Sequence, residues 1–200
     1  MSTTAGSEVL QLPWVLAPAF AGILVFFHVS EFAINAYFHP RDVHSRNFLC
    51  SRSYAAAMSL ATVEFVLEAW LAPGMKSSVY VVGAGAVGVL VGEALRKVGE
   101  ITAGRNFTHS IAYEHVPQHK LVTHGIYAWC RHPGYLGFFV WSVSTQVMLA
   151  NPVSFVVFVV VTWRFFDDRI REEEGLLVGF FGKQYEDYRA KVPTRIPGIP

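Results

Sequence analysis

A short polar motif, Arg131-His132-Pro133-Gly134-Tyr135, lies between a polar connector and an apolar run. Ionisable and hydrogen-bonding side chains at the border of a membrane span are costly unless they bind something. Pro133 suits the first turn of a helix, where its missing N–H costs nothing and free backbone donors can meet a polar ligand. The motif therefore predicts a helix start that binds a polar ligand.

A second polar segment, residues 163–174, begins at the end of the last apolar run of the chain. Within it Arg169 and Glu173 are four residues apart, so a helix would place them on one face. A guanidinium can hold a carboxylate through two parallel hydrogen bonds, and a carboxylate can face a cation. This pair predicts a site that binds an anionic group beside a cationic one.

Composition places these motifs in a membrane protein. Apolar residues make up 52% of the 200 residues and charged residues only 16%, whereas soluble domains carry about 25% charged residues. The net charge is +1, and no cluster of Lys and Arg interleaved with aromatic residues indicates a nucleic-acid partner. The length predicts a single membrane-embedded domain, residues 1–200, because typical domains have about 100–150 residues.

The hydropathy pattern predicts an all-α, polytopic fold with about five transmembrane helices. Crossing the hydrocarbon layer takes about 20 helical residues, and the chain has five apolar runs, Trp14–Phe38, Tyr54–Ala72, Val79–Leu95, Tyr135–Ala150 and Val153–Phe166. The last two are short and meet at Asn151-Pro152, a turn signal. We expect them to form a helical hairpin whose second arm continues past Phe166.

The distribution of positive charge predicts the orientation. Of sixteen Lys and Arg residues, three lie in 39–53 (Arg41, Arg46 and Arg52), five in 96–134 and seven from Arg164 onward, and only Lys76 lies in the turn 73–78. Loops rich in Lys and Arg stay in the cytosol. We therefore expect a cytosolic C-terminus and a cytosolic polar pocket, with the N-terminus on the other side.

A glycine-rich segment, residues 83–88, matches the G-x-G-x-x-G fingerprint of dinucleotide-binding folds. That fold needs an acidic residue about 20 positions later, and residues 101–105 have none. Small residues at Ala84, Gly88 and Gly92 recur every four positions instead. They predict a helix face that another helix approaches closely.

Two further motifs predict no additional chemistry. His115 and His119 have the i, i+4 spacing of metal ligands, but Pro117 breaks the helix that would align them. Cys50 and Cys130 lie far apart in the chain. Neither the histidines nor the cysteines therefore indicate a metal site. Asn106-Phe107-Thr108 is a glycosylation sequon on the expected cytosolic side, so we expect it to stay unmodified.

The apolar runs also contain acidic residues, Glu31, Glu64 and Glu68. Such residues can form proton relays in transporters, or they can hydrogen-bond between helices. No Lys or Arg that matches these acidic residues lies within the spans, and no internal repeat suggests a transporter. We therefore favour hydrogen bonding between helices.

Together the two polar motifs resemble the signature of isoprenylcysteine carboxyl methyltransferases, over a stretch from about Gly104 to Pro197. The resemblance implies an integral membrane enzyme of the endoplasmic reticulum with S-adenosyl-L-methionine as cofactor. It would methylate the C-terminal carboxylate of farnesylated or geranylgeranylated cysteine on CaaX-processed proteins. The cofactor pocket would be built by the 104–134 connector, the helix start and the C-terminal tail.

The resemblance also implies residue roles. Arg169 matches the arginine assigned to the substrate carboxylate, and together with Glu173 it would form the catalytic pair. The implied cofactor-binding residues are His119, Lys120, Leu121, Val122, Tyr127, His132, Pro133, Gly134, Tyr135 and Glu173. The chain departs from the animal members at Ala112, where they carry Gln.

Two other functions remain open on these residues. A related membrane phospholipid or lipid methyltransferase would share the fold and the cofactor pocket. The acidic run 172–174 followed by residues 182–188 is more similar to the prenylcysteine branch of the family. A small membrane transporter is a more remote alternative.

Overall fold

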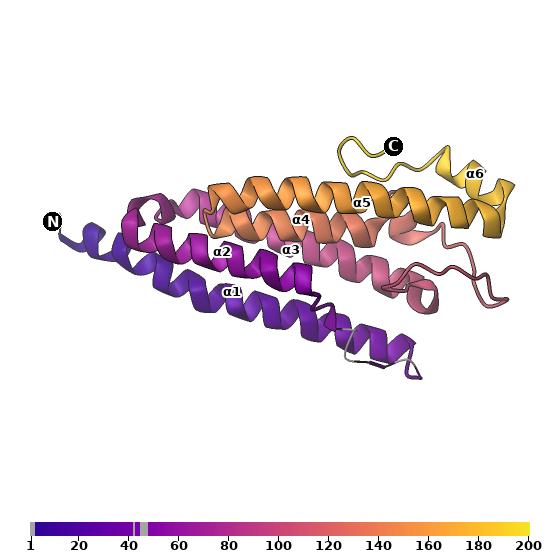
Figure 1. Cartoon of the computed structure of the whole chain (residues 1–200), viewed down its shortest axis with the longest axis horizontal. Helices are drawn as coiled ribbons and strands as arrows, with labels where there is room; N and C mark the ends of the chain where they lie inside the picture. The colour runs from indigo at the N-terminus through magenta and orange to yellow at the C-terminus, as the bar shows by residue number, and fades with distance from the viewer. Residues whose placement is uncertain (1–2, 42, 45–47) are drawn as a thin grey trace.

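The computed structural model describes residues 3–41, 43–44 and 48–200, with side chains from Trp14 onward. These residues form helices and loops, and no strand occurs among them. The long helices run side by side along the long axis of the molecule (Figure 1). Their bounds are α1 Thr3–Phe38, α2 Arg52–Leu71, α3 Val79–Ala103, α4 Pro133–Met148 and α5 Pro152–Phe181, followed by the short α6 Lys183–Arg189. Arg46, part of the predicted charge distribution, lies outside the described residues.

Each predicted apolar run corresponds to one helix, although two runs extend one or two residues past the helix end. Three of these helices are long and apolar enough to cross a membrane. Those segments are Trp14–Phe38, Arg52–Leu71 and Val79–Asn106. Helix α4 has 16 residues, a length of about 24 Å at 1.5 Å per residue. Helix α5 has 30 residues and continues past Phe166 to Phe181, as predicted. The count of five membrane crossings stays a prediction.

Helices α3 and α4 pack backbone to backbone through glycines. A Cβ atom at Gly85 would lie 2.2 Å from Met148 N, and one at Gly92 would lie 2.4 Å from Trp141 N. Gly88 faces Ser144 in the same way, whereas Ala84 is exposed. The small-residue face was therefore predicted correctly, but with Ala84 in place of Gly85. Close packing of this kind holds α4 in a fixed position against α3.

The turn between α4 and α5 is held by a buried lysine. Lys76 lies in the one-turn 3₁₀ helix η2, Pro73–Lys76, and is 0% exposed. Its Nζ donates to Glu68 Oε2 at 2.6 Å and to Asn151 Oδ1 at 2.7 Å. The backbone carbonyl groups of Leu149 and Ala150 also accept from it, each at 3.0 Å. Asn151 in turn donates to the backbone of α2.

The acidic residues of the spans have specific partners. Glu64 accepts hydrogen bonds from the backbone N–H groups of Val153 and Ser154, at 2.7 and 2.6 Å. It thus caps the N-terminus of α5, where the helix dipole favours an anion. Interhelical hydrogen bonding is therefore confirmed. Glu68 and Glu31 also have basic partners, namely Lys76 for Glu68 and Arg96 and Lys97 for Glu31, all of which lie outside the five predicted apolar runs.

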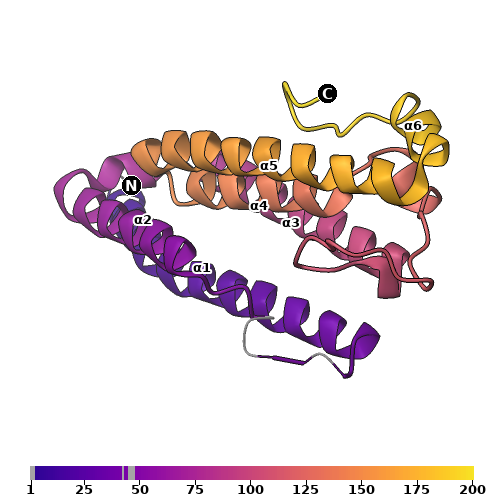
Figure 2. The same cartoon turned by 45° about the vertical axis from the view of Figure 1, so that its right-hand side comes forward.

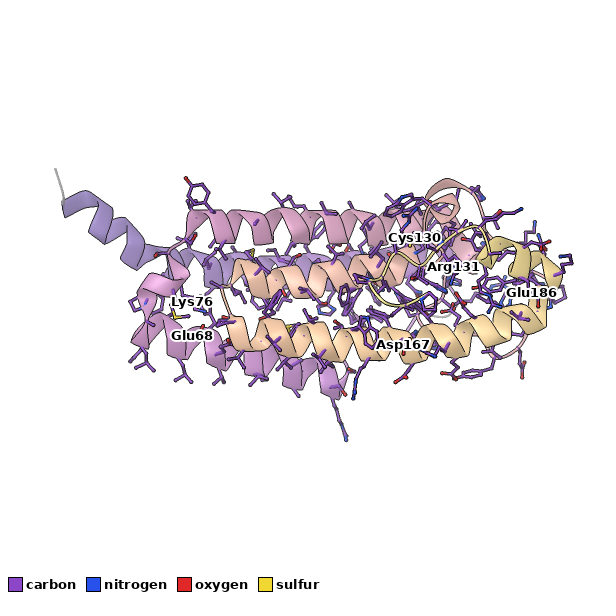
Figure 3. The ribbon with its side chains drawn as sticks, turned by 90° about the horizontal axis from the view of Figure 1, so that it is seen from above. Glu68, Lys76, Cys130, Arg131, Asp167 and Glu186 are labelled. Atoms are coloured by element: carbon purple, nitrogen blue, oxygen red, sulfur yellow. The ribbon has the colours of Figure 1, made fainter. Side chains whose placement is uncertain are left out.

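The two ends of the bundle differ in character. Lys76 and Glu68 lie at one end, and Arg131 and Glu186 lie at the other (Figure 3). Figure 2 shows the connector between α3 and α4 at this second end, together with α6 and the C-terminal segment. The polar half of α5 reaches the same end, since the helix continues beyond its apolar part. Both polar motifs of the sequence therefore meet there.

Candidate active site

A pocket opens at the polar end of the bundle, between the connector, the start of α4, the polar half of α5 and α6. Nine of the ten predicted cofactor-binding residues line it, namely Lys120, Leu121, Val122, Tyr127, His132, Pro133, Gly134, Tyr135 and Glu173. His119 does not line the pocket. Its ring packs near His115 and Phe180, with ring centroids 5.9 and 6.5 Å away.

The start of α4 forms one wall of this pocket. Pro133 is in the first turn of the helix and His132 is its N-cap residue, as the motif predicts. Gly134 faces Phe107 closely, since a Cβ atom there would lie 2.9 Å from the Phe107 ring. The His132 ring stacks on the Tyr135 ring at 5.4 Å between centroids. The motif thus places two rings and a helix N-terminus against the pocket.

Tyr135 joins the two residues of the predicted catalytic pair. Its hydroxyl donates to Glu173 Oε2 at 2.5 Å and accepts from Arg169 Nε at 2.8 Å. Arg169 and Glu173 therefore do lie on one face of α5, on the side that contacts α4. Arg169 lies just outside the pocket lining, and its Nη2 donates to the His109 backbone carbonyl at 2.6 Å.

An ion pair fixes the base of the pocket. Arg131 is buried and lies 2.7 Å from Glu174 Oε1 through its Nη2. His132 Nε2 lies 3.1 Å from the same oxygen. Burial alone would raise the pKa of Glu174, but the hydrogen bonds and charges of His132 and Arg131 lower it to about 2. Glu174 is therefore ionised at neutral pH and holds the helix start against α5.

Arg131 also ties down the C-terminal segment. Its Nη1 donates to the Val192 carbonyl at 2.5 Å, and its Nη2 donates to the Pro200 carbonyl at 2.8 Å. Its backbone N–H donates to the Pro193 carbonyl at 3.0 Å. These bonds hold residues 192–200 beside the start of α4.

Several pocket residues were not predicted. Asn106, Phe107 and Thr108 line the pocket, although the sequence analysis considered them only as a sequon. Asn106 Oδ1 accepts from the Lys120 backbone N–H at 2.8 Å, which holds the two parts of the connector together. The other unpredicted lining residues are Ala103, Arg131, Leu177, Phe181, Tyr185 and Tyr188. Leu177 and Phe181 come from α5, and Tyr185 and Tyr188 come from α6. Only the packing of these helices shows that they line the pocket.

The fold and the pocket define a multi-pass helical membrane protein whose polar site lies at one end of the bundle. Residues 84–179 match the model of the isoprenylcysteine carboxyl methyltransferase (ICMT) family. A probable protein-S-isoprenylcysteine O-methyltransferase of Oryza sativa subsp. japonica is 49% identical, over 90% of this chain and 95% of the relative. Protein-S-isoprenylcysteine O-methyltransferase A of Arabidopsis thaliana is 47% identical, over 88% and 90%.

Solved structures agree with these relatives. The structure of the eukaryotic intramembrane Ras methyltransferase ICMT is 39% identical and superposes with a TM-score of 0.90. The match covers 92% of this chain and 67% of that one. The chain therefore belongs to the isoprenylcysteine carboxyl methyltransferase family, and it is a membrane-embedded methyltransferase.

Proposed function

We propose that the protein transfers a methyl group from S-adenosyl-L-methionine to the C-terminal carboxylate of a prenylated cysteine on CaaX-processed proteins, forming a methyl ester. The observation that carries this proposal is the hydroxyl of Tyr135, which contacts Arg169 at 2.8 Å and Glu173 at 2.5 Å beside the pocket. Arg169 suits a carboxylate, and Glu173 suits a cation. The site lies at the end of an apolar bundle, where a lipid-linked substrate can reach it.

The residues of the pocket fit this cofactor. Glu173 offers a carboxylate to a cationic amino group, and the start of α4 offers a helix N-terminus to a polar group. Apolar and aromatic walls from Leu121, Val122 and Tyr127 suit a flat ring system.

Bound in the pocket, the cofactor would supply an electrophilic methyl group on a sulfonium. The acceptor needs no general base, because a terminal carboxylate has a pKa of about 3.3–3.7 and is ionised at neutral pH. Arg169 would hold one end of the carboxylate so that a free oxygen faces the methyl carbon. Alignment and exclusion of water are therefore the sources of rate that the protein has to provide.

The position of the protein in the membrane supports a prenylated cysteine as the acceptor. A farnesyl or geranylgeranyl chain gains about 0.8 kcal/mol for each CH₂ group buried in lipid, while its carboxylate stays at the interface. An enzyme in the bilayer can bind both parts at once. The charge distribution of the chain favours a pocket and a C-terminus that face the cytosol. Membership of the family supports a location in the endoplasmic reticulum membrane.

An acceptor assay with the purified full-length protein tests this function. We expect methyl transfer from labelled S-adenosyl-L-methionine to a farnesylated or geranylgeranylated cysteine and none to phosphatidylethanolamine. The reverse preference would establish the lipid methyltransferase alternative. A protein that binds no S-adenosyl-L-methionine in titration calorimetry would refute both methyltransferase assignments.

A further inference from the structure

Glu31, near the polar end of α1, is the centre of a buried ion network outside the pocket. It is 0% exposed, and Arg96 of α3 donates to both of its oxygens at 2.6 Å. Lys97 Nζ contacts Oε1, and His109 Nε2 lies 2.9 Å from Oε2. Two cationic side chains of α3 and one histidine of the connector between α3 and α4 therefore hold Glu31.

Two routes of direct contact lead from Glu31 to the proposed site. In the first, the side chain of His109 contacts Glu31 while its backbone carbonyl accepts from Arg169 at 2.6 Å. In the second, Arg96 Nη1 donates to the Gly134 carbonyl at 3.0 Å, in the first turn of α4. One carboxylate on α1 is therefore connected both to Arg169 and to the helix start.

A metal site is the other arrangement that these residues could suggest, since Glu31, Glu100 and His109 place ligand atoms within 4.8 Å of one another. Both oxygens of Glu31 are already taken by cationic groups, however. A metal ion would have to displace them and would lie beside two positive charges. The contacts therefore favour an ion network with a structural or positioning task.

We infer that Glu31 is a positioning residue for methyl transfer. By holding His109, it fixes the backbone carbonyl that orients Arg169 toward the substrate carboxylate, and by holding Arg96 it fixes the start of α4. This inference rests on the proposed function of Arg169. It assigns a task in catalysis to α1, which contributes no residue to the lining of the proposed pocket.

Replacement of Glu31 by glutamine tests the inference, with Glu68→Gln as the matched control. Glu68 is also a span glutamate paired with a buried cation, Lys76, but it lies at the opposite end of the bundle (Figure 3). We expect Glu31→Gln to lower kcat for a farnesylated cysteine about 10- to 100-fold, since misplacement of about 1 Å can cost that much. The Kd for S-adenosyl-L-methionine should change less than kcat, because the contact from Arg96 to the start of α4 is a single hydrogen bond to a backbone carbonyl.

The control separates positioning from general stability. Glu68→Gln should keep kcat within about twofold of the wild type even where it lowers Tm, because additivity within that margin is expected of distant sites. Equal losses of kcat in both variants would overturn the inference. So would a Glu31→Gln variant that keeps wild-type kcat.

A double-mutant cycle asks whether Glu31 acts through Arg169. In an Arg169→Lys background, Glu31→Gln should lower kcat by less than about threefold, since residues in one network are not additive. A full 10- to 100-fold further loss, on the scale of the single variant, would mean that Glu31 does not act through Arg169 and would refute the proposed route.

A measurement that does not need activity completes the test. We expect Glu31→Gln to speed hydrogen exchange of the backbone in residues 105–112, and Glu68→Gln to leave it unchanged. If Glu31→Gln does not fold, His109→Leu takes its place and should show the same faster exchange and lower kcat. His109→Gln keeps a donor for Glu31, so its exchange and kcat should stay close to those of the wild type. Unchanged exchange in the folded variants would refute the positioning role. A wild-type protein without activity on prenylcysteine would refute the proposed function alone, and the exchange comparison would still decide the role of Glu31.

Discussion

Tyr135 on α4 and Glu173 on α5 are joined by a hydrogen bond of 2.5 Å, and Glu173 lines the proposed cofactor pocket. The same hydroxyl accepts from Arg169, the proposed ligand of the substrate carboxylate. One phenol therefore connects the part of the site that faces the cofactor with the part that faces the substrate. Changes to the three residues should be separable by measuring cofactor affinity and turnover together.

The first prediction separates the members of the catalytic pair. Arg169→Lys keeps the charge but loses the planar fork that matches a carboxylate. Turnover of a prenylated cysteine should fall about 100-fold or more, with near-normal affinity for S-adenosyl-L-methionine. Glu173→Gln should instead weaken cofactor binding, because it removes the anion that faces the amino group. Calorimetry and steady-state kinetics on both variants decide the roles. If Arg169→Lys mainly loses cofactor affinity and Glu173→Gln mainly loses turnover, the two assigned roles must be exchanged.

The second prediction concerns the helix start. His132→Ala and Tyr135→Ala should each weaken binding of S-adenosyl-L-methionine, because both side chains line the pocket. Both proteins should stay folded in detergent, which gel filtration and a thermal melt can check. Cofactor affinity equal to wild type in both variants would show that the pocket is assigned wrongly.

The third prediction uses the ion pair at the base of the pocket. The folded-state pKa of Glu174 is about 2, below its ordinary value of 4.5, so its stabilising effect is present above about pH 4.5 and is lost as the pH falls toward 2. Glu174→Gln should lower stability at pH 7 by about 1.5–3 kcal/mol, the range for hydrogen bonds to charged groups. The difference from wild type should shrink across that pH window.

Glu186→Gln is the control for this measurement, because Glu186 is exposed on α6. It should change stability by less than about 0.5 kcal/mol at any pH, as surface substitutions usually do. Thermal melts of the two variants from pH 7 to pH 3 provide the comparison. A Glu174→Gln effect that persists unchanged at pH 3 would contradict the assigned ion pair.

The fourth prediction tests the close packing of α3 and α4. Gly85→Ala should destabilise the protein by about 1–3 kcal/mol, the usual cost of overpacking, because the new methyl group would meet the Met148 backbone at 2.2 Å. Gly83→Ala, two residues earlier, should be tolerated, since nothing lies within 4 Å of its Cβ position. Similar melting temperatures for the two variants would argue against the observed helix contact.

The fifth prediction concerns orientation in the membrane. Cys50 is exposed and Cys130 is buried, so Cys50 should react with a membrane-impermeant thiol reagent in sealed microsomes with their cytosolic face outward. In a Cys50→Ser background, Met75→Cys should react only after the membrane is permeabilised, because residue 75 lies in the predicted lumenal turn and is exposed. Asn106 should carry no glycan. Labelling of both positions from the same side would contradict the predicted topology.

Much of the fold could be predicted from the residues alone. Apolar runs, the Asn151-Pro152 turn and the continuation of α5 are local signals, and the structure confirms each of them. The small-residue face was predicted with one wrong member, Ala84. Sequence spacing identifies glycines at helical intervals, but only the rotation of α3 against α4 decides that Gly85 is in the contact.

Lys76 illustrates what local signals cannot show. In the sequence it is only one positive charge in a short turn, yet in the structure it is buried and holds the turn between α4 and α5. Likewise, Arg96 and Lys97 directly follow an apolar run, and in the sequence they were counted among the charges of the segment 96–134. In the structure α3 continues through them to Ala103, so they face Glu31 on α1.

By itself the sequence determined the membrane class and the helices, because hydropathy and turn residues depend on neighbours along the chain. The motifs of the family identified half of the residues that line the pocket. Tertiary structure decided which side chains meet. Glu31 and His109 come from distant parts of the chain, and so do Tyr135 and Glu173. Such contacts depend on the packing and rotation of whole helices, which no local pattern of residues specifies.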